Sequence, residues 1–159
     1  MEIERKYLVR GTPPEGRQVP VQLVQGYVAI DSEAEVRVRV AGEAAFLAVK
    51  TFRKPGSISR HELEYPIPLR DAGEMLAACC AGRIVLKRRR VVEHAGMAWE
   101  IDEYSGANEG LIVAEVELAS ETQSVELPAW VGAEITHDAR YSNRNLATRP
   151  VSTWTAAAR

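Results

Sequence analysis

The chain has 159 residues, enough for one domain with a substantial hydrophobic core. Its hydrophobic fraction of 46% and charged fraction of 26% are ordinary for a folded protein and exclude intrinsic disorder. Basic residues number 20 and acidic residues 22, so the formal net charge is -2. This balance argues against a general binder of nucleic acid or of an anionic membrane, because such proteins carry a clear basic excess.

No apolar run approaches the roughly 20 residues that a transmembrane helix needs. The N-terminus opens with charged residues, which is not the pattern of a signal peptide. We therefore expect a cytoplasmic protein without a membrane partner. Cys79 and Cys80 are adjacent, so they offer neither a disulfide framework nor the spacing of a zinc site, and we expect them to pack on a helix face.

Most of the chain alternates polar and apolar residues with the two-residue period of a β-strand. The strand-like segments are joined mostly by short turns and lie at residues 2–9, 18–30, 35–40, 45–52, 60–66, 83–92, 97–104 and 111–118. Eight strands connected in this way predict an antiparallel sheet.

Three segments depart from this period. Residues 71–81 carry apolar side chains at helical spacing, with Asp71 as the expected N-cap and Gly82 just after the C-terminus. Residues 121–130 predict a helical turn or two, and residues 138–147 predict a further helix. The strands are thus accompanied by a few short helices.

One face of the predicted strands is charged and the other is apolar. The charged faces carry Glu2, Glu4, Lys6, Arg37, Arg39, Lys50, Glu62, Glu64, Lys87, Arg89, Glu100, Asp102, Glu115 and Glu117. For any single strand, this pattern fits an open sheet with one solvated face. Repeated over seven strands, it also fits a barrel with the charged side inward and helices outside, wide enough to hold a small ligand. Arg5, Arg88 and Arg90 fall on the opposite face, where we expect surface salt bridges.

A charged interior requires partners, because an unpaired buried charge is costly. Arginine and lysine donors from several strands suit the tetrahedral oxygens of phosphates. The Glu-x-Glu pairs, about 6.6 to 7 Å apart along a strand, offer only oxygen ligands, which suit Mg²⁺ or Mn²⁺ rather than zinc or copper. Cations, phosphate and metal together indicate a nucleotide or polyphosphate site and phosphoryl transfer to water.

The motifs, taken in order, resemble those of the CYTH superfamily, the triphosphate tunnel metalloenzymes. Glu2-Ile3-Glu4-Arg5-Lys6 matches the Glu-x-Glu-x-Lys signature of that family. The later matches are Gln25-Gly26-Tyr27, Arg37-x-Arg39, Lys50, Glu62-x-Glu64, Lys87-x-Arg89, Asp102, Glu115-x-Glu117 and Arg140-Tyr141-Ser142-Asn143. The resemblance implies an α+β, mainly β fold, a closed eight-stranded antiparallel β-barrel that forms a charged tunnel with peripheral helices. We assign residues 1–147 to a single tunnel domain and residues 148–159 to a C-terminal tail.

The resemblance also implies a metal-dependent hydrolase of triphosphates, most similar to the short bacterial tripolyphosphatases, which release pyrophosphate and phosphate. Carried over position by position, the expected ligands of Mg²⁺ or Mn²⁺ are Glu2, Glu4, Glu115 and Glu117, with Asp102 as a ligand or as an acceptor behind the ligands. The expected phosphate-binding residues are Lys6, Arg37, Arg39, Lys50, Lys87 and Arg89. Lys6, Lys87 and Glu4 are expected to act in catalysis. Glu62 and Glu64 are expected to hold a second metal or to orient the cations.

Three other functions stay open at this point. A class IV adenylate cyclase would use the same charges but needs an adenine pocket, for which no residue stands out. A thiamine triphosphatase would differ only in its leaving group, and a polyphosphate- or nucleotide-binding module would bind without turnover. In each case the expected partner is a small-molecule triphosphate rather than a nucleic acid, and a homodimer is compatible with the sequence.

Overall fold

The structure, a computed structural model, describes residues 1–52 and 56–155. Within these residues a ten-stranded antiparallel sheet dominates. Its strands are β1 (Glu2–Val9), β2 (Val21–Ile30), β3 (Ala34–Ala41), β4 (Ala44–Thr51), β5 (Ser59–Arg60), β6 (Glu62–Pro66), β7 (Ile84–His94), β8 (Met97–Tyr104), β9 (Ile112–Glu117) and β10 (Val131–Glu134). The helical elements are α1 (Leu69–Ala78), η1 (Gly106–Asn108), η2 (Ala139–Tyr141), α2 (Asn143–Thr148) and η3 (Val151–Thr153). In the described part of the chain, no helix is long and apolar enough to cross a membrane.

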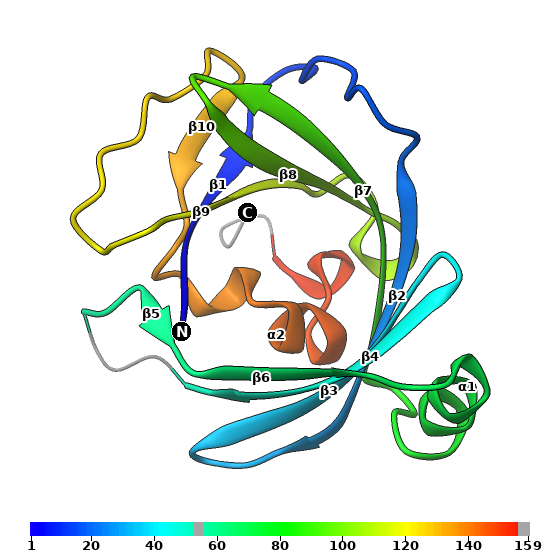
Figure 1. The fold of residues 1–159 in the computed structure, drawn as a ribbon. Coiled ribbons are helices and arrows are strands. Elements are labelled where there is room, and N and C mark those ends of the chain that lie inside the picture. Colours follow the sequence, from blue (N-terminus) through cyan, green and yellow to red (C-terminus); the bar gives the residue numbers. More distant parts are fainter. Residues whose placement is uncertain (53–55, 156–159) are drawn as a thin grey trace.

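The sheet curves around a central space (Figure 1). Its strand order is β10-β1-β9-β8-β7-β2-β3-β4-β6, and β5 pairs with β1 off this path. The predicted mainly β, antiparallel class is confirmed. The closed eight-stranded barrel is not, because the described residues form ten strands and the two ends of the path share no ladder.

The departure from eight strands has a local cause at β1 and at His61. The free edge of β1 is divided between β5, which pairs at Glu2 and Ile3, and β10, which pairs at Tyr7 and Val9. The predicted strand over residues 60–66 is interrupted at His61, which leaves β5 at the seam and β6 at the end of the path. The two-residue pairing of β5 with β1 is therefore what connects the β6 end of the path to β1.

The predicted helices differ from the observed ones at their ends. Helix α1 begins at Leu69, after Pro68 rather than at Asp71, and ends at Ala78. Residues 121–130 contain no helix; they run as turns and extended chain into β10, a strand too short to show an alternating pattern.

The predicted helix over residues 138–147 is two separate elements. The side chain of Asp138 accepts a hydrogen bond from Arg140 N and begins η2. The side chain of Ser142 accepts one from Asn145 N and begins α2. Two caps four residues apart end one helical element and begin the next, so a continuous helix does not form.

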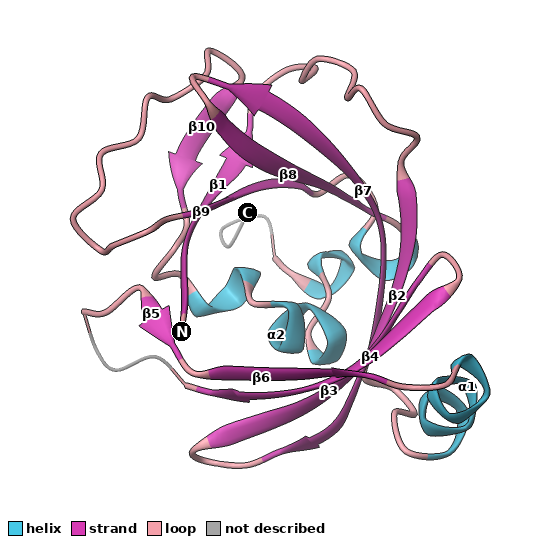
Figure 2. Ribbon diagram, in the orientation of Figure 1, coloured by secondary structure: helices cyan, strands magenta, loops and turns pink. Residues whose placement is uncertain are grey.

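One apolar cluster joins Leu146 of α2 to the inward-facing Val85, Tyr104 and Val113; another lies outside the curved sheet, where α1 covers β2, β3 and β4 (Figure 2). Val38 and Cys80 are completely buried in this layer, which confirms the packing role expected for Cys80, whereas Cys79 is exposed. A Cβ at Gly26 would lie 2.8 Å from Cys80 Sγ and from Leu76 Cδ2. Only glycine therefore allows the helix to pack this closely on β2.

The C-terminal segment also packs on the domain as far as the structure describes it. The Trp154 and Tyr141 rings meet edge to face with centroids 5.2 Å apart, and Leu146 is completely buried beside them. As predicted, Arg5 and Arg88 form surface ion pairs on the outer face. Arg90 pairs with Glu103 as well but is only 8% exposed.

Candidate active site

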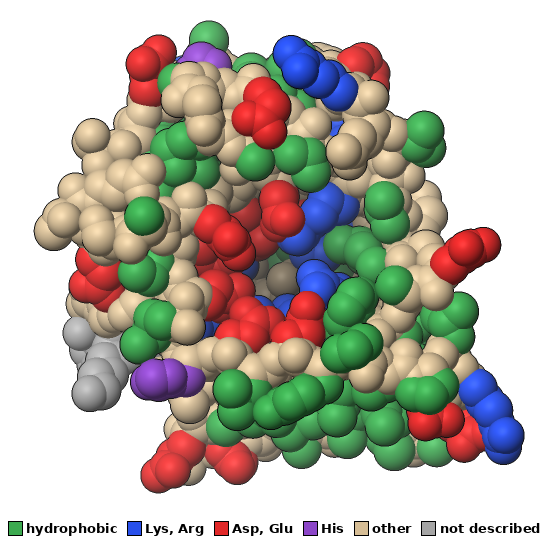
Figure 3. Space-filling view, viewed as in Figure 1, with side chains coloured by type: hydrophobic (Ala, Val, Ile, Leu, Met, Phe, Trp, Pro, Cys, Tyr) green, Lys and Arg blue, Asp and Glu red, His purple; other side chains and the backbone are tan. Residues whose placement is uncertain are grey.

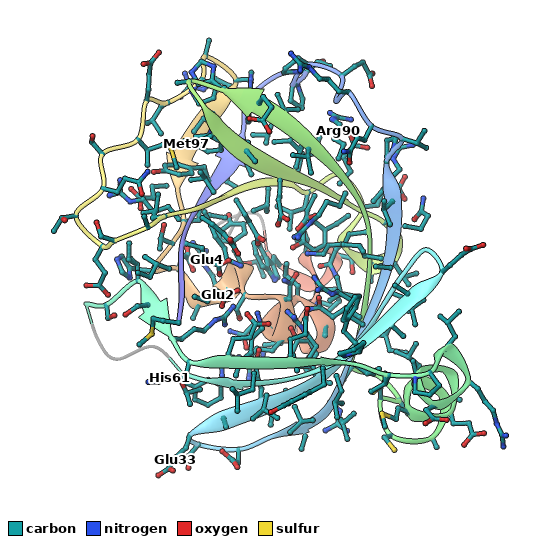
Figure 4. The ribbon with its side chains drawn as sticks, viewed as in Figure 1. Glu2, Glu4, Glu33, His61, Arg90 and Met97 are labelled. Atoms are coloured by element: carbon teal, nitrogen blue, oxygen red, sulfur yellow. The ribbon has the colours of Figure 1, made fainter. Side chains whose placement is uncertain are left out.

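The charged faces of the strands turn inward and line one cavity of about 210 Å³, which we call the tunnel. Figure 3 shows acidic and basic side chains gathered in this hollow, and Figure 4 shows Glu2 and Glu4 pointing into it from β1. Every predicted site residue except Asp102 lines the tunnel. Sequence reasoning did not assign site roles to four further residues that line it, Gln25, Arg60, Glu100 and Asn143.

The β1–β9 wall places Lys6 between carboxylates. Lys6 lies opposite Glu115 in the ladder, and its Nζ donates to Glu115 Oε1 at 2.7 Å and lies 3.4 Å from Glu4 Oε1. Burial lowers the pKa of Lys6, but the carboxylates of Glu115 and Glu4 more than offset this and raise it overall. Lys6 is therefore a protonated donor at neutral pH in the tunnel wall.

Glu115 makes the folding stability of the protein depend on pH. Burial raises the pKa of Glu115, but Lys6, Lys87 and Arg89 outweigh burial and hold it well below 4.5. The unfolded chain therefore binds this proton more readily than the folded chain, so the stabilisation is complete above about pH 4.5 and is lost as the pH falls. We expect the free energy of unfolding, measured with urea, to decrease from about pH 5 downwards. Glu115→Gln should show a shallower decrease, and an unchanged slope would contradict this assignment.

The β7–β8 wall is held by Asp102, which is completely buried. Its oxygens accept from Arg89 Nε at 2.7 Å and Arg89 Nη2 at 2.6 Å, and Lys87 Nζ donates to Oδ2. Burial raises the pKa of Asp102, but Lys87 and Arg89 lower it overall. These contacts support the role of an acceptor that orients two tunnel cations, one of the two roles expected for Asp102.

On the β3–β4–β6 wall, the second carboxylate pair also orients cations. Arg37 Nη2 donates to Glu62 Oε1 at 3.2 Å and to Glu64 Oε2 at 3.1 Å. Arg39 Nη2 donates to Glu64 Oε1 at 2.9 Å, and Lys50 Nζ lies 2.8 Å from Glu62 Oε2. These contacts support the cation-orienting role of Glu62 and Glu64.

Arg60 belongs to β5 and pairs with Glu2 of β1 in the short β5–β1 ladder. Its Nε donates to Glu2, and its Nη2 donates to Glu4 Oε1 at 3.3 Å. Burial raises the pKa of Glu2, but Lys50 and Arg60 lower it overall to well below its usual value. Arg60 has the same parity as Glu62 and Glu64, so strand alternation could have placed it on the charged face. Arg60 is the first residue of the predicted strand 60–66, so the signal was already present in the sequence.

A larger cavity of about 390 Å³, which we call the antechamber, adjoins the tunnel at its α2 end. Lys6, Arg37, Arg60 and Asn143 line both cavities, so the two spaces share a wall. Glu35, on the same face of β3 as Arg37, lines the antechamber. Its parity with Arg37 and Arg39 was the sequence signal for its inward direction.

The carboxylates of β1 and β9 have the donor chemistry of a site for a hard divalent ion. Glu2, Glu4, Glu115 and Glu117 line the tunnel together, and Glu4 and Glu117 are direct neighbours across the ladder. Among the described residues, no three carboxylates, histidines or cysteines are gathered closely enough to form a preassembled metal site. Glu117 is exposed and forms no ion pair with the described residues, whereas the other three are bonded to cations.

A family model for the CYTH domain matches residues 1–151. The chain belongs to the CYTH family. This CYTH chain is 40% identical over 149 residues to an inorganic triphosphatase of Acetivibrio thermocellus, with 94% of each chain covered. It is 38% identical over 150 residues to an inorganic triphosphatase of Nitrosomonas europaea, covering 92% of this chain and 96% of that protein. The crystal structure of an inorganic triphosphatase superposes with a TM-score of 0.68 at 37% identity and covers 93% of this CYTH chain and 95% of the other.

Proposed function

We propose that this chain is a divalent-metal-dependent hydrolase of triphosphates and that its main substrate is inorganic tripolyphosphate, cleaved to pyrophosphate and phosphate. The observation that carries the proposal is the convergence of seven cations on one cavity, namely Lys6, Arg37, Arg39, Lys50, Arg60, Lys87 and Arg89. Guanidinium forks and ammonium groups held by neighbouring carboxylates form a preorganised receptor for phosphate oxygens. The names of the two relatives support hydrolysis as the outcome of binding.

In this proposal, water attacks the terminal phosphorus, the bond to the bridging oxygen breaks, and pyrophosphate leaves. Lys6 and Lys87 neutralise the charge that develops on the phosphate oxygens, and Glu4 accepts the proton of the attacking water. Glu2, Glu4, Glu115 and Glu117 would hold Mg²⁺ or Mn²⁺. When bound, such an ion neutralises phosphate charge and acidifies water. The proposal treats the curved sheet as a closed tunnel, and the β5–β1 pairing supports this.

A phosphate-release screen tests the proposal. Tripolyphosphate, ATP, GTP, pyrophosphate and thiamine triphosphate would each be incubated with Mg²⁺ or Mn²⁺ and, in parallel, with a chelator. We expect the fastest release from tripolyphosphate and none with the chelator. Faster formation of cyclic AMP from ATP would favour an adenylate cyclase, and tight binding without turnover would favour a binding module. A higher rate with thiamine triphosphate would change the substrate but not the reaction.

Arg60 is expected to contribute directly to substrate binding, because it lines both cavities and its guanidinium lies beside the tunnel carboxylates. Arg60→Gln should raise KM for tripolyphosphate about 10- to 100-fold, the usual cost of losing one charge-assisted hydrogen bond. Arg88→Gln is the matched control, since it removes the same charge from the outer face, where its side chain is 49% exposed. Equal KM values for the two variants would show that Arg60 does not contact substrate.

A further inference from the structure

Glu35 differs from the other buried carboxylates of the described residues. Glu4, Asp102 and Glu115 each accept from a tunnel cation, whereas Glu35, only 5% exposed, has no hydrogen bond or ion pair from its carboxylate to a described residue. Its cross-strand neighbour Lys50 donates to Glu2 Oε1 at 3.0 Å and pairs with Glu62 rather than with Glu35. The charge of Glu35 acts on Arg60, whose pKa it helps to raise, but no hydrogen bond or close ion pair to a described residue holds the carboxylate, and burial in this way is costly.

Of the described cavities that adjoin the tunnel, only the antechamber shares lysine and arginine side chains with it. Lys6, Arg37 and Arg60 line both the tunnel and the antechamber. The described grooves at the opposite mouth are lined by carboxylates, Glu2, Glu62, Glu64 and Glu117 in one and Glu4, Glu100, Glu115 and Glu117 in the other, and by no lysine or arginine. A polyanion longer than the tunnel would therefore follow the cations towards the α2 end, where Glu35 lies in the wall.

We propose that Glu35 restricts the tunnel to chains of three phosphates by excluding a fourth phosphate from the antechamber. The inference rests on the proposed function and specifies its substrate class. Glu35 lies two residues from Arg37 on the same face of β3, about 7 Å along the strand. A fourth phosphate that passed Arg37 would meet the negative charge of Glu35, which is buried in the wall and held by no hydrogen bond or close ion pair to a described residue, and the two like charges would repel.

The antechamber is less suited to an aromatic group carried by an organic triphosphate. Of the aromatic rings in its wall, Phe52 is covered by the Arg144 guanidinium, whose central carbon lies 3.9 Å from the ring centroid. Tyr141 packs against Trp154 and Arg140, and Tyr27 is only 1% exposed. Stacking of a base on Phe52 would require displacement of Arg144. A fourth phosphate needs no such stacking surface, so the charge of Glu35 is the feature that decides its entry.

The test compares linear tripolyphosphate with linear tetrapolyphosphate in the wild type, in Glu35→Gln and in Asp138→Asn. Asp138 lines the same antechamber, but it is already neutralised by Arg140 at 2.6 Å, so its variant is the matched control. Turnover would be measured as kcat/KM with Mg²⁺. Binding would be measured by calorimetry with a chelator present, and thermal unfolding would check the fold of each variant.

We expect the wild type to prefer tripolyphosphate by about tenfold or more and Glu35→Gln to remove most of this preference, with Asp138→Asn unchanged. An unchanged preference in Glu35→Gln, or equal binding of the two chains by the wild type, would overturn the proposal. Loss of turnover with both chains at unchanged binding would assign Glu35 to the chemistry instead. Selective loss of ATP or thiamine triphosphate binding would assign the antechamber to an organic group. If the wild type hydrolyses no triphosphate, the proposed function fails, but the ratio of Kd values still tests Glu35.

Discussion

Replacing Glu117 with glutamine should lower kcat for tripolyphosphate about a hundredfold or more while changing the free energy of unfolding by no more than about 0.5 kcal/mol. Glu117 is exposed at the tunnel mouth and forms no ion pair with the described residues, so its charge supports no fold contact. Its neighbour across the ladder is Glu4, with which it would share a divalent ion. The loss of turnover should therefore occur without a loss of stability, because the Glu117 carboxylate would bind the metal ion and makes no contact that stabilises the described fold.

Phosphate release measured against Mg²⁺ and Mn²⁺ concentration checks this, together with a calorimetric metal titration. Half-saturation by metal should shift about 10- to 100-fold to higher concentration in Glu117→Gln. Glu126→Gln is the control, because that side chain is 77% exposed and lines neither the tunnel nor the antechamber. Turnover and metal dependence like those of the wild type would show that Glu117 is not a ligand.

Replacing Asp102 with asparagine should lower the free energy of unfolding by about 3–5 kcal/mol. The substitution preserves shape but leaves the Lys87 ammonium, which is 2% exposed, without its counter-charge, and it weakens the two bonds from Arg89. The remaining buried positive charge accounts for most of the loss. Because Asp102 also orients Lys87 and Arg89 in the tunnel, tripolyphosphate turnover should fall as well.

Urea unfolding followed by far-ultraviolet circular dichroism measures this effect. Glu74→Gln is the control, since it breaks an exposed pair with Arg70 on α1 and should cost about 0.3–0.5 kcal/mol. Lys87→Met combined with Asp102→Asn removes the stranded ammonium and should recover part of the stability. A loss in Asp102→Asn no larger than that of Glu74→Gln would show that the buried pair does not stabilise the fold.

Much of the site could be predicted locally. In any strand, side chains two residues apart share a face whatever the strand pairs with, so the grouping of Glu2, Glu4 and Lys6, and of Arg37 and Arg39, follows from the sequence alone. The turn at Gly96 and the strand Met97–Tyr104 follow from equally local signals. The family resemblance then supplied the direction in which the charged faces point.

Other features depend on pairing between distant segments. Asp102 shares a face with Glu100, yet only the register of β7 against β8 brings Arg89 opposite Asp102 and buries its carboxylate. Likewise, Arg60 meets Glu2 because β5 pairs with β1 across 58 residues of chain. No local pattern encodes such contacts.

The sequence by itself determined which side chains lie together on each strand, because strand geometry has a period of two residues. Only the tertiary structure decided that these faces line one cavity, that Glu62, Glu64 and Asp102 hold cations, and that Glu35 forms no hydrogen bond or close ion pair with the described residues. The curvature of the sheet and the register of its ladders arise from contacts between residues far apart in the chain. The partner of each inward charge is set by those contacts rather than by its neighbours in sequence.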